Sequence, residues 1–132
     1  MKPSFTPKQA VGQYWEHRAE TFLSQKGLKF IARNFSTQCG EIDLIMLDHL
    51  HIAFIEVRYR QPSRFGNAGL SITAAKRRRI TRCAQGFLQQ HPKWRSHPCR
   101  FDVIAYDAGV NSREPHWLRA AFESTTSASA VD

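Results

Sequence analysis

The chain has 132 residues, of which 19 are Lys or Arg and 11 are Asp or Glu, so its formal net charge is +8 at pH 7. This length suits one domain with a single hydrophobic core and excludes two such domains. The sequence shows neither a membrane-spanning stretch nor the apolar region of a secretory signal, so we expect a cytoplasmic protein without membrane contacts. The excess of positive charge predicts a polyanionic partner such as nucleic acid.

Residues 6–26 are predicted to form an amphipathic helix. Thr6 is a suitable N-cap, a proline occupies the first helical position, and a glycine ends the run. Glu16 lies beside the apolar stripe, where a glutamate commonly pairs with Arg or Lys. The stripe itself comprises Val11, Trp15, Ala19, Phe22 and Leu23.

Three strands are predicted to follow this helix. Residues 28–35 form a short first strand whose alternation of polar and apolar residues is imperfect. Residues 40–47 and 52–60 are rich in β-branched and aromatic residues and flank a polar turn, so they predict an antiparallel hairpin.

Acidic residues interrupt both strands of this hairpin. Glu41, Asp43 and Glu56 lie among residues typical of a buried core. A charged group is rarely buried unless it is paired or binds a metal. Because side chains alternate along a strand, Glu41 and Asp43 are expected to share one face with Ile45 and Leu47.

The two strands are expected to bring Asp43 and Glu56 together. Whether the connecting loop has two or four residues, both carboxylates emerge on the same face, roughly 5 to 8 Å apart between Cβ atoms. Two carboxylates at this separation can share a hard divalent cation such as Mg²⁺ or Mn²⁺. The alternative is a pair of strand acids bridged by Arg58 or Arg60.

Residues 61–70 are rich in Gly, Pro, Ser and Asn and are predicted to form a loop. The loop directly follows the acid-bearing strand, so it is well placed to grip a substrate. Arg64 is a candidate phosphate contact. Phe65 is a candidate base contact, although a phenylalanine in a loop is more often a local packing anchor.

A second helix is predicted over residues 73–90, with a cationic cluster in its first turns. Lys76 lies one turn before the apolar Ile80, so it is expected to point toward the sheet and to reach the acids or a bound phosphate. The other cations form a solvated face able to attract nucleic acid, with Arg77, Arg78 and Arg82 as the candidate contacts.

Residues 99–106 and 116–123 are predicted to be the last two strands. An acid in the first of them, Asp102, is expected to pair with a neighbouring arginine rather than join the acidic site. The order helix, three strands, helix, two strands predicts one α/β domain over residues 1–123, with a mixed central sheet flanked by helices. Residues 124–132 have low complexity and are expected to be a disordered tail.

These motifs together resemble a known nuclease superfamily. Asp43 followed after twelve residues by Glu56-Val57-Arg58 resembles the D…(D/E)-x-K signature of the restriction-endonuclease-like nucleases. More narrowly, the hairpin segments resemble the YraN-type family of small endonuclease-like proteins, which is similar to archaeal Holliday-junction resolvases. The further matches are Glu16-His17-Arg18-Ala19, Arg33-Asn34, Phe65-Gly66, Lys76 and Arg100-Phe101-Asp102-Val103.

The resemblance implies a restriction-endonuclease-like fold and Mg²⁺- or Mn²⁺-dependent cleavage of DNA, with branched or damaged DNA as a candidate substrate. It implies that Asp43, Glu56 and the backbone carbonyl of Val57 hold the metal, with Glu16 leaning over the same site. The remaining candidate catalytic residues are Glu41, Arg58 and Lys76, and the candidate nucleic-acid contacts are Arg60, Arg64, Arg77, Arg78 and Arg82.

The chain departs from the family pattern at two positions. Trp15 replaces the usual glycine, and Arg58 replaces the usual lysine of the signature. An arginine stays protonated, so it can position or stabilise a charge but cannot accept a proton. This departure favours a second hypothesis, a nucleic-acid-binding module without catalysis, while a third is a homodimer formed through the hairpin or through Trp94 and Trp117.

Overall fold

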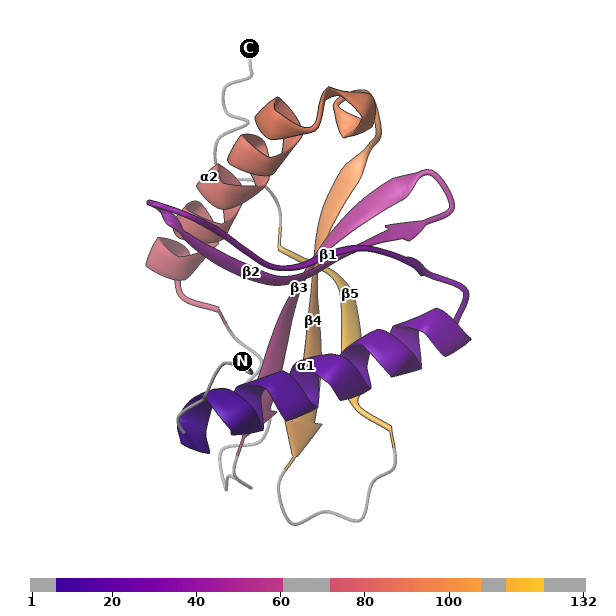
Figure 1. Ribbon diagram of the computed structural model, residues 1–132, viewed down its shortest axis with the longest axis vertical. Helices are drawn as coiled ribbons and strands as arrows, with labels where there is room; N and C mark the ends of the chain where they lie inside the picture. The colour runs from indigo at the N-terminus through magenta and orange to yellow at the C-terminus, as the bar shows by residue number, and fades with distance from the viewer. Residues whose placement is uncertain (1–6, 61–71, 108–113, 123–132) are drawn as a thin grey trace, which may run out of the picture.

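The computed structural model describes residues 7–60, 72–107 and 114–122. Within these ranges two α-helices enclose a single mixed sheet, which confirms the predicted α/β class (Figure 1). Neither of these helices has the length and apolar character needed to cross a membrane. The elements in chain order are α1 (Pro7–Gln25), β1 (Lys29–Thr37), β2 (Gly40–Asp48), β3 (His51–Arg60), α2 (Ala74–Gln90), the short 3-10 helix η2 (Pro92–Trp94), β4 (Cys99–Asp107) and β5 (His116–Phe122).

The strands lie in the sheet in chain order, from β1 to β5. Neighbouring strands are antiparallel except for β3 and β4, which run parallel and are connected through α2. In the β2–β3 hairpin, Leu47 pairs with Ile52, which is the register of a loop over residues 48–51, and Asp48 pairs with His51 within that loop. The next positions along the two strands, beyond Leu44 and Ile55, are Asp43 and Glu56.

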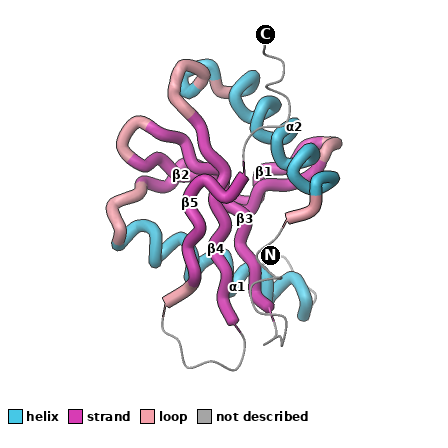
Figure 2. Tube along the Cα trace, turned by 180° about the vertical axis from the view of Figure 1, so that it is seen from behind, coloured by secondary structure: helices cyan, strands magenta, loops and turns pink. Residues whose placement is uncertain are grey.

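The two helices cover opposite faces of the sheet (Figure 2). On the α1 side, the core contains residues of β2, β3 and β4 together with Ala19 and Leu23 of the helix. On the α2 side, Ile80, Cys83 and Phe87 pack against the sheet. Each helix thus contributes a buried stripe with helical spacing, as predicted.

The start of α2 is fixed by a side-chain cap. The Thr73 hydroxyl accepts a hydrogen bond of 3.2 Å from the backbone N–H of Lys76. This cap satisfies one of the N–H groups that have no partner within the helix. It sets the helix one residue later than predicted and fixes the turn that carries Lys76.

Two apolar residues of the predicted elements are exposed. Val11 is 49% exposed, because Trp15, one turn later, is the first described residue of α1 that packs into the core. Phe30 is 43% exposed because β1 changes register between Phe30 and Ala32, which breaks the alternation of its faces. The guanidinium of Arg33 lies over the Phe30 ring, 4.6 Å from its centroid.

Candidate metal site at a fork in the sheet

The sheet divides between β2 and β3. Among the described residues, the pairs joining these strands run from Asp48 and His51 to Leu44 and Ile55. Beyond that point the start of β2 pairs with β1 and the end of β3 pairs with β4, so the sheet forks (Figure 1). The acids identified in the sequence lie where the fork opens.

Asp43 occupies the centre of the fork. Its Oδ2 accepts a hydrogen bond of 2.8 Å from the backbone N–H of Val57 on β3. Its carboxyl group also forms side-chain hydrogen bonds with Glu16 of α1 and Glu56 of β3. A hydrogen bond between two carboxyl groups requires that one of them carry a proton. Burial, followed by the charge of Glu56, raises the pKa of Asp43 to about 9, so Asp43 holds that proton.

Glu16 and Glu41 complete an acidic group on one side of Asp43. One carboxylate oxygen from each of these three residues lies within 4.8 Å of the others. Glu16 is half-buried, and burial, followed by the charge of Glu41, raises the pKa of its carboxyl group. Glu41 is exposed, and its Oε2 accepts a hydrogen bond of 3.4 Å from the Ser36 hydroxyl. The cluster therefore joins α1 and β2.

Glu56 reaches Asp43 from β3 and is buried. The ammonium group of Lys76, in the first turn of α2, forms an ion pair with its Oε2. The predicted direction of Lys76 is therefore confirmed. Lys76 neutralises one of the four acids, and it ties the α2 layer to the fork.

The expected sharing of a face by the residues of β2 is wrong in part. Glu41 and Asp43 do gather with Glu16. However, Ile42 joins the same core as Ile45, on the α2 side, whereas strict alternation would place them on opposite faces. The alternation breaks because β2 pairs with two strands after Leu44 but with β1 alone before it.

Asn34 supports the acidic group from β1, directly across from Asp43 in the register. Its side chain hydrogen-bonds to Glu16. Its φ of 53° lies in the left-handed region, which asparagine adopts more readily than most residues. The sequence offered only the Arg33-Asn34 motif as a signal for this role. Arg33 in turn pairs with Glu20 of α1 at 2.7 Å, so β1 and α1 are held together beside the site.

The arginines proposed from the sequence have different environments. Arg58 is half-buried on β3, two residues after Glu56, and therefore on the same side of the strand. On α2, Arg77 donates a hydrogen bond of 3.1 Å from Nε to the carbonyl oxygen of Ile72, while Arg78 and Arg82 are exposed. Arg64, Phe65 and the side chain of Arg60 lie outside the described residues.

Asp102 does not belong to the acidic group. It is buried on β4, where both carboxylate oxygens accept hydrogen bonds of 3.1 Å from Nε of Arg100. It also accepts hydrogen bonds from the Trp117 indole at 3.1 Å and from the backbone N–H of Ala120 at 2.9 Å. The prediction that it pairs with a neighbouring arginine is confirmed. The hydrogen bond from its indole N–H to Asp102 holds Trp117 half-buried against the sheet.

Trp15, the other departure from the nuclease pattern, has a packing role. Its ring stacks on Tyr59 of β3, with the centroids 4.5 Å apart and an interplanar angle of 14°. It also contacts Tyr106 of β4 at 4.8 Å, and the Arg18 guanidinium lies 5.1 Å from its ring centroid. This cluster fastens α1 to the sheet next to Glu16.

Comparison with known sequences identifies the family of the chain. The profile of the uncharacterised protein family UPF0102 matches residues 15–106, from the turn of α1 that carries Glu16 to the end of β4. The chain belongs to the UPF0102 family. The matched range includes all four acids of the fork, together with Lys76 and Arg58.

Several UPF0102 proteins align with nearly the whole chain. The protein of Stutzerimonas stutzeri is 43% identical over 116 residues, which cover 88% of this chain and 97% of the relative. The protein of Pseudomonas fluorescens is 45% identical over 118 residues, covering 88% and 95% of the two chains. The protein of Psychrobacter cryohalolentis is 40% identical over 141 aligned positions, covering 89% and 82%.

Proposed function

We propose that this UPF0102 protein is an endonuclease that uses Mg²⁺ or Mn²⁺ to cleave DNA, with branched or damaged DNA as the preferred class. The observation that carries the proposal is the convergence of four carboxyl groups on the fork, one of which is ion-paired with Lys76. These groups come from α1 and from the β2–β3 hairpin, which are separated in sequence by the whole of β1. Carboxyl groups brought this close repel one another when ionised, and a bound cation would relieve that repulsion.

The residues at the fork fit a hard divalent cation. Every side-chain donor is a carboxylate oxygen, which is the ligand type that Mg²⁺ and Mn²⁺ prefer. Burial, followed by the charge of Glu56, raises the pKa of Asp43, so this carboxyl group holds a proton in the metal-free fold that a bound cation would displace. Asp43 and Glu56 would hold the metal, assisted by Glu16 or Glu41. The N–H and C=O of a strand residue face the same side, so the Val57 carbonyl also faces the fork.

When bound, the metal would polarise a phosphate and lower the pKa of an attacking water. The surrounding residues have separate tasks. Glu16 and Glu41 are placed to accept a hydrogen bond from that water. Arg58 stays protonated and stabilises negative charge on the phosphate. Lys76 supplies a second positive charge from α2, while Arg78 and Arg82 attract the DNA backbone.

Metal binding and cleavage provide the test. Calorimetric titration with Mg²⁺ and Mn²⁺ should show binding to the wild type and none to Asp43→Ala, and a panel of single-stranded, duplex, flap and four-way DNA should show cleavage by the wild type alone. Glu16→Gln should weaken both activities. Glu20→Gln is the matched control, because Glu20 lies one turn later on α1 but pairs with Arg33 outside the cluster. Equal metal binding by the wild type and Asp43→Ala would overturn the proposal.

A nucleic-acid-binding module without catalysis is the second candidate function. Arg58 favours it, because this residue cannot act as a base. This alternative predicts DNA affinity that falls steeply as salt rises, and no cleavage products with any divalent metal.

A further inference from the structure

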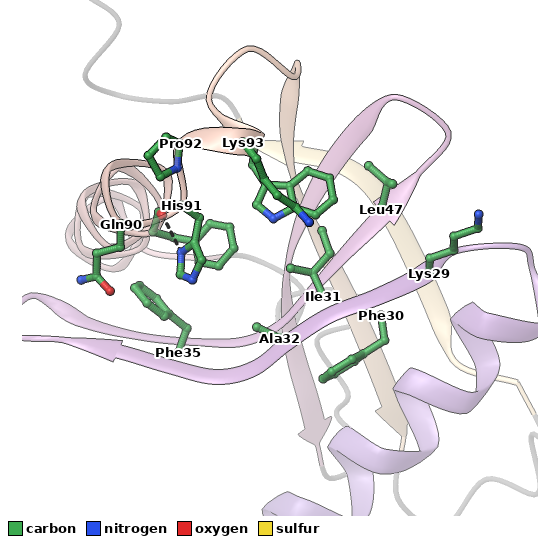
Figure 3. A pocket seen from close by; sticks show the side chains of 12 residues that line it. Lys29, Phe30, Ile31, Ala32, Phe35, Leu47, Gln90, His91, Pro92 and Lys93 are labelled. Carbon is green, nitrogen blue, oxygen red and sulfur yellow. Dashed lines mark hydrogen bonds between the residues drawn. The ribbon is translucent and has the colours of Figure 1, made fainter.

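A groove lies on the α2 side of the sheet, at its β1 edge (Figure 3). It has a volume of about 730 Å³. Residues of β1, among them Ile31 and Phe35, form one wall. The C-terminal end of α2 and the helix η2 form the other wall, from which Lys93 projects across the opening. A groove of this size accommodates a segment of an extended polymer.

The lining combines aromatic rings with positive charge. The Lys93 ammonium lies 4.7 Å from the centroid of the Trp94 ring, and Lys29 lines the groove from β1. None of the described residues that line the groove is acidic. Aromatic rings for bases and cations for phosphates are the two components of a surface that binds single-stranded nucleic acid.

We propose that this groove binds a single-stranded segment of DNA, with a base on Trp94 and phosphates at Lys29 and Lys93. The inference rests on the proposed nucleic-acid substrate and deepens it, because it assigns a second contact remote from the acidic fork. The two sites lie at opposite ends of α2, with Lys76 at the fork and Gln90 at the groove. These two residues are fourteen positions apart, which on a helix spans about 20 Å, the length of about six base pairs of duplex.

This spacing would let the groove favour DNA that has both a duplex part and a single-stranded part. Duplex DNA meets the exposed cations of α2, whereas bases in a duplex are stacked on one another and cannot stack on a protein ring. A strand that leaves the duplex offers unstacked bases. DNA with a single-stranded branch can therefore occupy the groove while its duplex part lies near the fork.

Fluorescence anisotropy with a labelled oligothymidine tests the proposal by binding alone, in the presence of EDTA. Trp94→Leu, which keeps an apolar side chain, should weaken binding roughly 5- to 150-fold, as expected for one stacked base. The double variant Lys29→Gln, Lys93→Gln should lower the slope of log affinity against log salt by about 1.4, because each phosphate contact on a single strand contributes about 0.7. Binding of a blunt duplex should be unchanged in both variants.

Arg119→Gln is the matched control, because Arg119 lies 4.0 Å over the Trp117 ring but on β5, at the opposite edge of the sheet. It should bind the oligothymidine like the wild type. Asp43→Asn should also bind it normally, so loss of metal binding and loss of the groove give different results. Unchanged single-strand affinity in the groove variants would overturn the inference. So would equal losses for single strand and duplex, or displacement of the oligothymidine by an acidic peptide at equal concentration.

Discussion

The ammonium group of Lys76 and the carboxylate of Glu56 form an ion pair that connects α2 to β3 at the fork. In the metal-free fold, Lys76 therefore neutralises one acid of the cluster, as the proposed metal would. Glu56 is buried, so its charge requires a positive partner, and Lys76 provides one in the metal-free fold.

The variant Lys76→Met tests both the contribution of this ion pair to stability and its competition with the metal. Its metal-free form should lose about 1 kcal/mol of unfolding free energy, because Glu56 loses its ion pair with Lys76, whose side chain is partly exposed. Its Mg²⁺ affinity should rise by roughly three- to tenfold, since a competing cation is gone. Calorimetry and urea unfolding measure the two effects. A fall in Mg²⁺ affinity would show that Lys76 orders the site rather than competing with the metal.

Replacement of Arg58 tests the departure from the nuclease signature. Arg58→Lys should raise cleavage, or create it, because a lysine in that place is a compact donor that can also lose its proton. Lys76→Ala should lower the wild-type activity, and lower it less in the Arg58→Lys background, because the two cations act on the same phosphate. The four rates of this double-mutant cycle are the measurement. An inactive Arg58→Lys variant with intact metal binding would favour the binding module.

The stability of the metal-free protein should depend on the ionisation of Asp43. Its pKa in the fold is about 9, above its ordinary value of 3.8, so the folded state binds a proton that the unfolded state releases between these values. The contribution to stability is therefore complete below about pH 4 and declines as the pH rises toward 9.

Asp43→Asn removes this dependence, because an amide stays neutral and can still accept the hydrogen bond from Val57 N–H. In EDTA at pH 8 the variant should be more stable than the wild type by about 1 kcal/mol, or roughly 3 to 6 °C in Tm. At pH 4 the two proteins should melt together. Thermal unfolding across this pH range checks the sign, and a variant less stable than the wild type at pH 8 would contradict it.

Asp102 offers the opposite case, an acid that serves the fold. Asp102→Asn should cost roughly 3 kcal/mol, because Arg100 loses a buried charge partner and the Trp117 and Ala120 donors lose a carboxylate acceptor. Mg²⁺ affinity should not change. Urea unfolding combined with calorimetry distinguishes the two roles, and weakened metal binding by a folded Asp102→Asn would place this residue in the site.

Periodicity predicted most of the fold because each element has a local signal. Alternation and turn residues located the β2–β3 hairpin, and the apolar stripe of α2 fixed the direction of Lys76. Long-range pairing has no such signal. The contact of Asn34 with Glu16 joins β1 to α1, and neither residue carries a pattern that reports the other. For Glu16 the sequence left a cation as the expected partner, whereas the fold provides an amide and other acids.

The fork in the sheet could not be predicted from the local sequence pattern. Alternation assumes that a strand keeps the same neighbours along its length, and β2 changes from two neighbours to one at Asp43. The groove was hidden for a similar reason. It depends on how η2 follows α2 and faces β1, which brings Trp94 to Ile31 and Phe35 across a large separation in sequence.

The parallel pairing of β3 with β4 bears on how the protein folds. The β1–β2–β3 meander is closed by short turns, whereas β4 can join β3 only after α2 has spanned the distance between them. Contacts close in sequence form with less loss of chain entropy, so the meander is expected to form first. Asp43 and Glu56 therefore meet on a partly folded chain before Lys76 reaches them, and a divalent cation present at that moment would assist the chain in folding before it served any reaction.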